Sequence, residues 1–150
     1  MTGETIPIAR TEPPLRVRDF MTPCVFTLRE RDSLLQARAL FEARGIRHAP
    51  VVDQGRRLIG LATKRDLLRR VSPAEGELPA DLREAQLRTA RVGDIMTTEV
   101  NTIGPEVEIS QAARIMFENK YGCLPVVEHD ELVGILTEAD FVRYFISARE

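Results

Sequence analysis

The most constraining feature of this sequence is an internal duplication. Three blocks occur twice in the same order, and they begin at Val17, Ala49 and Gly60 in the first copy and at Val92, Leu124 and Gly134 in the second. The first two pairs are 75 residues apart and the third is 74 apart, so the lost residue falls in the turn that follows residues 49–52. A fixed period of this kind decides the architecture, and we predict two tandem copies of one structural unit.

Each copy is predicted to fold as β-α-β-β-α. The first strands are the β-rich runs 25–28 and 100–103. A helix follows, with Asp32 or Ser33 as its N-cap, Gly45 at its end, and an inner face of Leu34, Ala37 and Phe41 at helical spacing.

The second part of each copy is predicted to be a hairpin followed by a helix. Residues 49–52 and 58–62 are apolar runs on either side of a glycine-containing turn. The last helix opens at Thr63, with Leu67 and Leu68 on its inner side.

Two such units are expected to share one core, because a sheet of so few strands cannot bury both faces alone. The predicted fold class is therefore α/β (α+β), with the two repeats packed as a pair. The spacing of Leu82 and Ala85 favours a short helix between the repeats, with Leu87 off its face. The predicted boundaries are a flexible N-terminal arm over 1–14, repeat one over 15–71, a linker over 72–90 and repeat two over 91–150.

Composition argues against several classes of function. The formal net charge is −2 with both signs interspersed, which does not fit a nucleic-acid-binding or membrane-coating chain. No apolar run approaches the roughly 18 residues of a membrane span, and we expect a cytoplasmic protein. With two histidines and no metal-type spacing, the sequence predicts neither catalytic residues, nor a catalytic cofactor, nor a metal site.

The motif Gly-h-h-Thr-x-x-Asp, where h is apolar, is the strongest indication of a binding site, and it is intact in both copies. The threonine lies at a helix N-terminus, where free N–H groups and the helix dipole suit a phosphate. The aspartate, Asp66 or Asp140, could accept hydrogen bonds from the two hydroxyls of a ribose. The same spacing also describes a helix capping box that binds nothing, and the spacing alone leaves both interpretations open.

The ordered blocks Asp-h-Met-Thr, h-Pro-Val-Val and Gly-h-h-Thr-x-x-Asp resemble the signature of CBS (cystathionine β-synthase) repeats over residues 16 to 146. The resemblance implies a pair of repeats related by a pseudo-two-fold axis, with two clefts built from both repeats. The Thr and Asp of one repeat would hold phosphate and ribose, and the other repeat would supply the adenine pocket.

Carried over to this sequence, the resemblance assigns residues to both clefts. Cleft one would comprise Thr22, Val25, Ile46, Arg47, His48, Ala49, Pro50, Thr137 and Asp140. Cleft two would comprise Thr63, Lys64, Asp66, Thr97, Val100, Tyr121, Gly122, Cys123, Leu124 and Pro125. Arg47 and His48 favour cleft one for a phosphorylated ligand, with help from Arg44, whereas Gly122 and Cys123 bring no charge to cleft two.

The implied function is a stand-alone, non-catalytic sensor that binds AMP, ADP or ATP and acts on an unknown protein partner. S-adenosylmethionine and NAD are alternative adenosyl ligands. A second interpretation is a dimerisation or interaction module with empty clefts. The resemblance favours a homodimer in either case.

Overall fold

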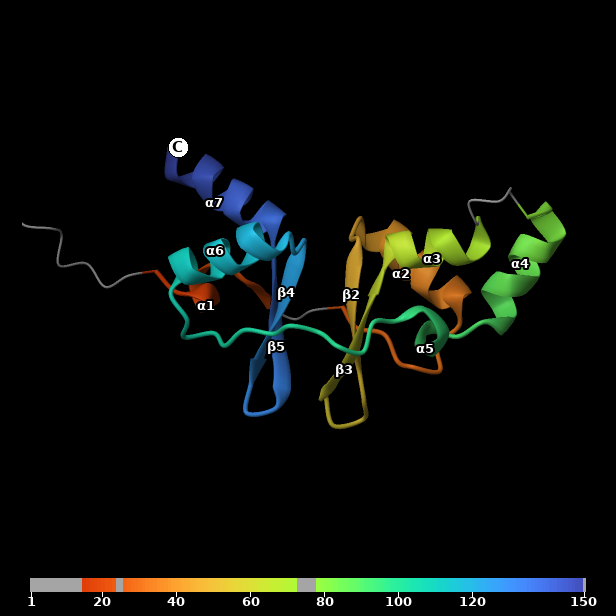
Figure 1. The fold of residues 1–150 in the computed structure, drawn as a ribbon. Coiled ribbons are helices and arrows are strands. Elements are labelled where there is room, and N and C mark those ends of the chain that lie inside the picture. Colours follow the sequence, from red (N-terminus) through yellow and green to blue (C-terminus); the bar gives the residue numbers. More distant parts are fainter. Residues whose placement is uncertain (1–14, 24–25, 73–77, 150) are drawn as a thin grey trace, which may run out of the picture.

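The computed structural model describes residues 15–23, 26–72 and 78–149, and these form two similar halves that stand side by side (Figure 1). Each half is a β-hairpin with its helices gathered at the end away from the hairpin turn. The predicted α/β class is confirmed, and each repeat has the predicted helix, hairpin and second helix in that order. The N-terminal arm predicted over 1–14 and the segment 73–77 of the predicted linker lie outside the described residues.

The first half is built on the antiparallel hairpin of β2 (His48–Val52) and β3 (Leu58–Thr63). Helix α2 (Leu34–Arg44) precedes the hairpin, α3 (Lys64–Val71) follows it, and α4 (Ala80–Thr89) packs against both helices. Ser33 caps α2 by accepting a hydrogen bond from the backbone of Gln36, and Gly45 ends the helix in the left-handed conformation, as predicted.

The second half repeats this plan with α6 (Ile109–Asn119), β4 (Cys123–Glu128), β5 (Glu131–Thr137) and α7 (Glu138–Arg149). Its hairpin turn is His129–Asp130, and both residues have positive φ. This turn is tighter than the one after β2, because two left-handed residues suffice to reverse a twisted pair of strands. The shorter turn explains why the period drops from 75 to 74 residues.

The segments that open the two repeats are exchanged between the halves. Helix α1 (Val17–Phe20) and strand β1 (Thr22–Pro23) join the second half, where Thr22 pairs with Ile135 of β5. Helix α5 (Val92–Ile95) joins the first half, and the following Thr97 pairs with Leu61 of β3. Each half is therefore completed by chain from the other repeat.

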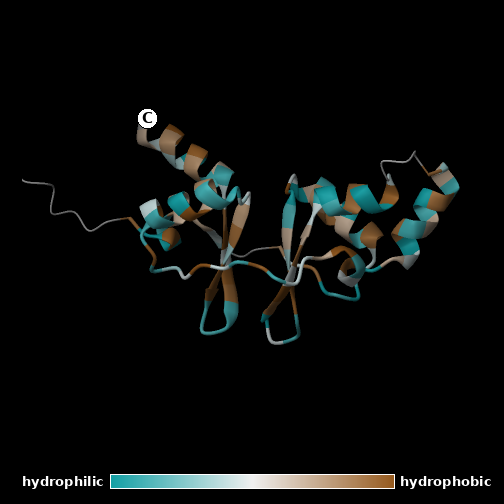
Figure 2. Cartoon of the chain, viewed as in Figure 1, coloured by the Kyte–Doolittle hydropathy of each residue, from teal (hydrophilic) through white to brown (hydrophobic). Residues whose placement is uncertain are grey.

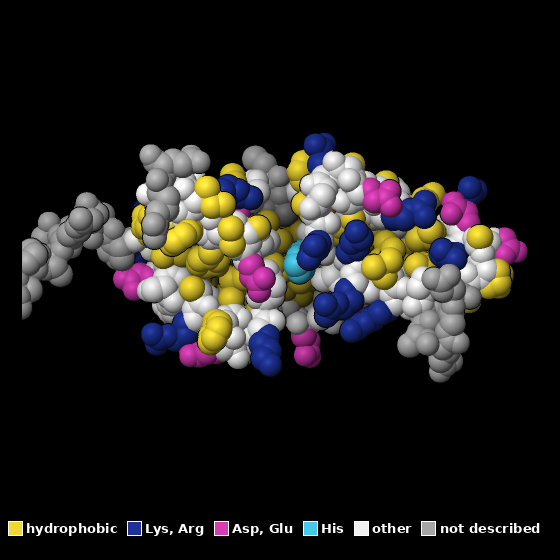
Figure 3. Space-filling view, turned by 90° about the horizontal axis from the view of Figure 1, so that it is seen from above, with side chains coloured by type: hydrophobic (Ala, Val, Ile, Leu, Met, Phe, Trp, Pro, Cys, Tyr) yellow, Lys and Arg dark blue, Asp and Glu magenta, His cyan; other side chains and the backbone are white. Residues whose placement is uncertain are grey.

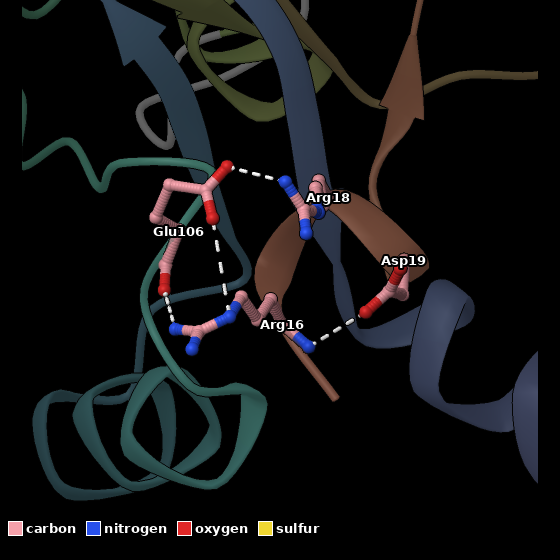
Figure 4. A network of polar contacts seen from close by, with 4 residues as sticks. All are labelled: Arg16, Arg18, Asp19 and Glu106. Atoms are coloured by element: carbon pink, nitrogen blue, oxygen red, sulfur yellow. Dashed lines mark hydrogen bonds and ion pairs between the residues drawn. The ribbon is translucent and has the colours of Figure 1, made fainter. Parts of the chain in front are cut away.

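Polar contacts fix the exchanged N-terminal segment to the second half (Figure 4). The Arg18 guanidinium lies 2.6 Å from a carboxylate oxygen of Glu106, and the Arg16 side chain donates to the Glu106 carbonyl. The backbone N–H of Arg16 donates to Asp19 at 2.8 Å, which caps α1. Because both arginines contact the same residue, α1 is tied to the loop before α6.

Two apolar clusters form the core, one in each half, and hydrophobic residues follow the strands (Figure 2). The first cluster contains Leu34, Phe41 and Leu67 together with Val92 from the exchanged α5. The second contains Leu124 and Leu136 together with Val17 from the exchanged α1. Val17 and Val92 are both fully buried, so the exchange is part of the core and not a surface contact.

Three local expectations need correction. Leu68 is 49% exposed, because the inner face of α3 is formed by Leu67 and Val71. In α4, Leu87 is the buried residue and Leu82 is exposed, because the face that meets α2 and α3 lies opposite to the predicted one. The runs 25–28 and 100–103 are not full strands. Their described parts contribute single parallel bridges, from Leu28 to Val51 and from Ile103 to Val126.

Candidate functional site

The centre of the candidate site is the junction of β5 and α7, where Asp140 lies three residues after Thr137. The Asp140 carboxylate accepts the backbone N–H of Thr137 at 2.7 Å and its hydroxyl at 3.2 Å. The predicted helix cap is therefore formed. Asp140 is only 2% exposed, and it is the one buried charged residue among those described.

The other oxygen of Asp140 is held by two further side chains. The Thr22 hydroxyl, from the exchanged strand β1, donates to it at 3.0 Å. The Arg143 guanidinium, one turn further along α7, donates at 2.8 Å. Thr22 and Asp140 are 118 residues apart in sequence, so this carboxylate joins the two repeats.

A cavity of about 490 Å³ opens beside this carboxylate. It brings together six of the residues predicted for cleft one, namely Thr22, Ile46, Arg47, His48, Thr137 and Asp140. The volume lies within the range of small-molecule sites, which is about 300 to 1,000 Å³. Ala49 and Pro50 of β2 do not line it, because both side chains are buried, and Val25 lies outside the described residues.

The cavity also contains residues that were not assigned to cleft one, of which Arg143 is the most consequential. Its place three residues after Asp140, on the same helix, could have indicated it. Arg44, named as an accessory residue, also lines the cavity, and its guanidinium lies 4.2 Å from the centre of the Phe26 ring. Gly122 of the other repeat closes the wall against His48.

The charge of the cavity is positive at its rim. Arg44, Arg47 and Arg143 line it, against the carboxylates of Glu138 and Asp140. Seen from above, basic side chains gather near the centre of this face and extend over the first half (Figure 3). A rim of this kind suits an anionic group, since guanidinium groups bind phosphate in a fork geometry.

The surroundings of His48 favour its neutral form. Burial, followed by the charge of Arg47, lowers the pKa of His48 below its ordinary value of 6.5, although Glu138 and Asp66 act in the opposite direction. A neutral imidazole can accept a hydrogen bond as well as donate one. Since Asp66 belongs to the other cleft, His48 lies between the two predicted sites.

The second predicted cleft is formed less completely. Asp66 accepts the Thr63 hydroxyl at 2.7 Å and the Thr63 N–H at 3.3 Å, so the same cap is present. Thr97 is exposed beside β3, and Lys64 is exposed at the start of α3. Tyr121 is half-buried and accepts a hydrogen bond from Asn101 at 2.7 Å.

Other residues predicted for the second cleft lie elsewhere. Val100 lines a separate cavity of about 440 Å³ near the hairpin turns, with Gly60 and Thr98. Leu124 and Pro125 of β4 are both fully buried, and Leu124 belongs to the core of the second half. Cys123 is buried as well, and burial raises its pKa to about 12, so the thiol stays protonated.

The two glycines of the repeated motif are needed by the backbone. A Cβ on Gly134 would lie 2.6 Å from the Met21 sulfur and 3.1 Å from the Thr22 carbonyl oxygen. A Cβ on Gly60 would come similarly close to the Met96 sulfur and the Thr97 carbonyl oxygen. The exchanged segments therefore pass close to the backbone at both glycines, and Met21 and Met96 pack against the core clusters.

Within the described ranges, no three His, Cys, Asp or Glu side chains lie close enough together to hold a metal ion. No helix in the described part of the chain is both long enough and apolar enough to span a bilayer.

Comparisons with known proteins agree with this architecture. A model of the CBS domain matches the chain twice, over residues 17–73 and 92–147. The AcuB protein of Vibrio cholerae is 34% identical, with a TM-score of 0.78, and the match covers 91% of this chain and 94% of that one. CBSX2, known from Arabidopsis thaliana, has been solved in complex with AMP; that structure is 28% identical, with a TM-score of 0.74, and the match covers 91% and 99% of the two chains.

Curated relatives differ in length. The CBS domain-containing protein YhcV of Bacillus subtilis is 31% identical over 83% of this chain and 81% of its own. Other relatives are longer. The chain spans 33% of the uncharacterized protein MJ1404 of Methanocaldococcus jannaschii and 23% of the inosine-5'-monophosphate dehydrogenase of Korarchaeum cryptofilum, at 30% and 35% identity.

Proposed function

Since this chain belongs to the CBS domain family, as its repeated motifs predicted, we propose that it is a regulatory module that binds an adenine nucleotide between its two repeats. The observation that carries the proposal is the cavity beside Asp140, which joins the Thr-x-x-Asp motif of one repeat to residues 46–48 of the other. The AMP bound by CBSX2 supports an adenosyl ligand.

The roles of the residues follow from their positions. The Asp140 carboxylate would accept hydrogen bonds from the ribose hydroxyls, and the cap at Thr137 would face the phosphate. Arg47 and Arg44 at the rim would bind the phosphate, and Ile46 would contact the adenine. AMP, ADP and ATP fit this rim better than S-adenosylmethionine, because the latter carries a positive sulfonium.

Regulation would follow from the position of the ligand between the repeats. The hydrogen bond from Thr22 to Asp140 joins chain segments of both repeats at the point where the ribose would bind. A ligand that changes this contact alters the equilibrium between arrangements of the pair, provided that it binds one of them better. A protein partner that contacts both halves would sense the change.

The decisive experiment is thermal unfolding with AMP, ADP, ATP, S-adenosylmethionine and NAD, with GMP as a control. A ligand at about 100 times its dissociation constant should add roughly 2.7 kcal/mol to the free energy of unfolding, which corresponds to several degrees. The shift should be lost in Asp140→Ala and retained in Asp66→Ala if this cavity is the working one. No shift with any adenosyl ligand at millimolar concentration would contradict the proposal.

A homodimer also remains a proposal, and exposed apolar side chains on the second half support it. Val142 and Ile146 of α7 are 59% and 55% exposed, and Phe117 of α6 is 86% exposed. Exposed apolar side chains of this size are a feature of interaction surfaces. If the clefts bind no ligand, association through this surface is the alternative function, and sedimentation analysis of Phe117→Ser against the parent protein tests it.

A further inference from the structure

We propose that Arg143 determines which adenosyl ligands this cavity accepts, by occupying the ribose-binding carboxylate until a phosphate group draws it away. This inference rests on the proposed function, since it concerns the same cavity. It goes further by assigning the exclusion of uncharged nucleosides to one named side chain.

The carboxylate of Asp140 accepts four hydrogen bonds from the protein itself. One oxygen accepts both hydrogen bonds of the Thr137 cap, and the other accepts Thr22 at 3.0 Å and Arg143 at 2.8 Å. A carboxylate has about four acceptor positions, so none remains for a ribose. A ribose can bind Asp140 only if Thr22 and Arg143 leave.

The first repeat provides an internal comparison. Asp66 forms the same cap with Thr63, but within the described residues its second oxygen accepts no hydrogen bond. The counterpart of Arg143 on α3 is Arg69, which is exposed and, among the described contacts, forms neither a hydrogen bond nor an ion pair with Asp66. The occupied state of Asp140 is therefore not a consequence of the motif.

Arg143 is placed so that it can move to a ligand. Its side chain is 67% exposed and lines the cavity, and its only described partner is Asp140. Arg44 and Arg47 lie on the same cavity, so a phosphate there would meet three guanidinium groups. A phosphate monoester carries more negative charge than a carboxylate and has three strong acceptor oxygens, which favours transfer of Arg143 from Asp140 to the phosphate.

The effect of Arg143 on affinity should therefore have opposite signs for neutral nucleosides and for nucleotides. For a neutral nucleoside, Arg143 competes with the ribose for Asp140 and provides no compensating contact. For a nucleotide, Arg143 exchanges its ion pair with the Asp140 carboxylate for an ion pair with the phosphate. Removal of its charge should therefore strengthen the binding of adenosine and weaken the binding of AMP.

The test is the affinity of AMP and of adenosine for Arg143→Gln, measured by titration calorimetry. All proteins carry Asp66→Ala, so that the other cleft lacks its carboxylate. An exposed ion pair is weak, so adenosine should bind about two- to fivefold more tightly in Arg143→Gln. AMP should bind about tenfold more weakly or worse, because a charge-assisted hydrogen bond is lost. Arg69→Gln is the matched control and should change neither affinity.

The possible outcomes separate the two proposals. If the Asp66→Ala parent binds neither AMP nor adenosine, the proposed function of this cavity fails, and the role of Arg143 fails with it. If the parent binds AMP but Arg143→Gln weakens both ligands alike, Arg143 only supports Asp140. If neither affinity changes, the contact between Arg143 and Asp140 is a surface ion pair without influence on ligand binding. Either of the last two results overturns the inference, and an unchanged melting temperature of Arg143→Gln confirms that the variant is folded.

Discussion

The two motif aspartates should contribute very differently to stability, although their sequences match. We consider Asp140→Asn and Asp66→Asn in the ligand-free protein. At Asp66 the amide keeps one oxygen for the Thr63 cap and mainly loses charge at the helix N-terminus, which costs about 0.3 to 1 kcal/mol. At Asp140 the same loss occurs in a residue that is 2% exposed.

The additional cost at Asp140 comes from its second oxygen. An amide nitrogen placed there cannot accept hydrogen bonds from Thr22 and Arg143. Because Arg143 is largely exposed, its ion pair contributes less than about 1 kcal/mol. The bond from Thr22 to a buried charge contributes about 1.5 kcal/mol or more. We therefore expect Asp140→Asn to lower the free energy of unfolding by about 2 to 3 kcal/mol in total, and Asp66→Asn to lower it by less than about 1 kcal/mol.

Urea denaturation followed by circular dichroism measures this difference. The chain has no tryptophan and two tyrosines, so helix content is a better signal than fluorescence. The slope of the unfolding free energy against urea concentration should be the same in both variants, so that the transition midpoint alone reports the difference in stability. Losses that agree within about 0.5 kcal/mol would refute the argument, because they would mean that the contacts of Asp140 to Thr22 and Arg143 stabilise nothing.

Two further predictions concern the linker helix and His48. Leu87→Ala should destabilise the protein by about 2 to 5 kcal/mol in chemical denaturation, because this side chain is 1% exposed against α2 and α3, whereas Leu82→Ala, on the exposed face, should cost less than about 0.5 kcal/mol. Because burial and Arg47 lower the pKa of His48, the unfolded chain binds its proton at higher pH. The free energy of unfolding should therefore fall as pH drops below 6.5, and His48→Gln should flatten this slope; an unchanged slope would contradict the role of His48.

The sequence predicted the repeated architecture well because its signals are local. Ser33 and Thr63 cap helices through side chains that lie within three residues of their partners. Gly45 ends a helix through its own backbone conformation. Patterns of this kind depend on neighbouring residues, so a single sequence is enough to identify them.

The features that the sequence did not predict depend on packing between distant segments. The burial of Leu87 depends on where α2 and α3 leave space, and nothing in residues 80–89 alone indicates that face. The contact of Thr22 with Asp140 required knowledge that β1 pairs with the second repeat. The two-sided site was expected only from the resemblance to CBS repeats, while Arg143 could have been noticed from its spacing to Asp140.

The exchange of the opening segments has a consequence for synthesis on the ribosome. The first half cannot bury its core until Val92 has been made, and Thr22 must wait for Ile135 and Asp140 near the other end of the chain. Such distant contacts slow folding, because a long loop must close before they form. The first half can therefore form its core once residues up to Thr97 have been made, whereas the second half must wait until Ile135 and Asp140 are available to Thr22.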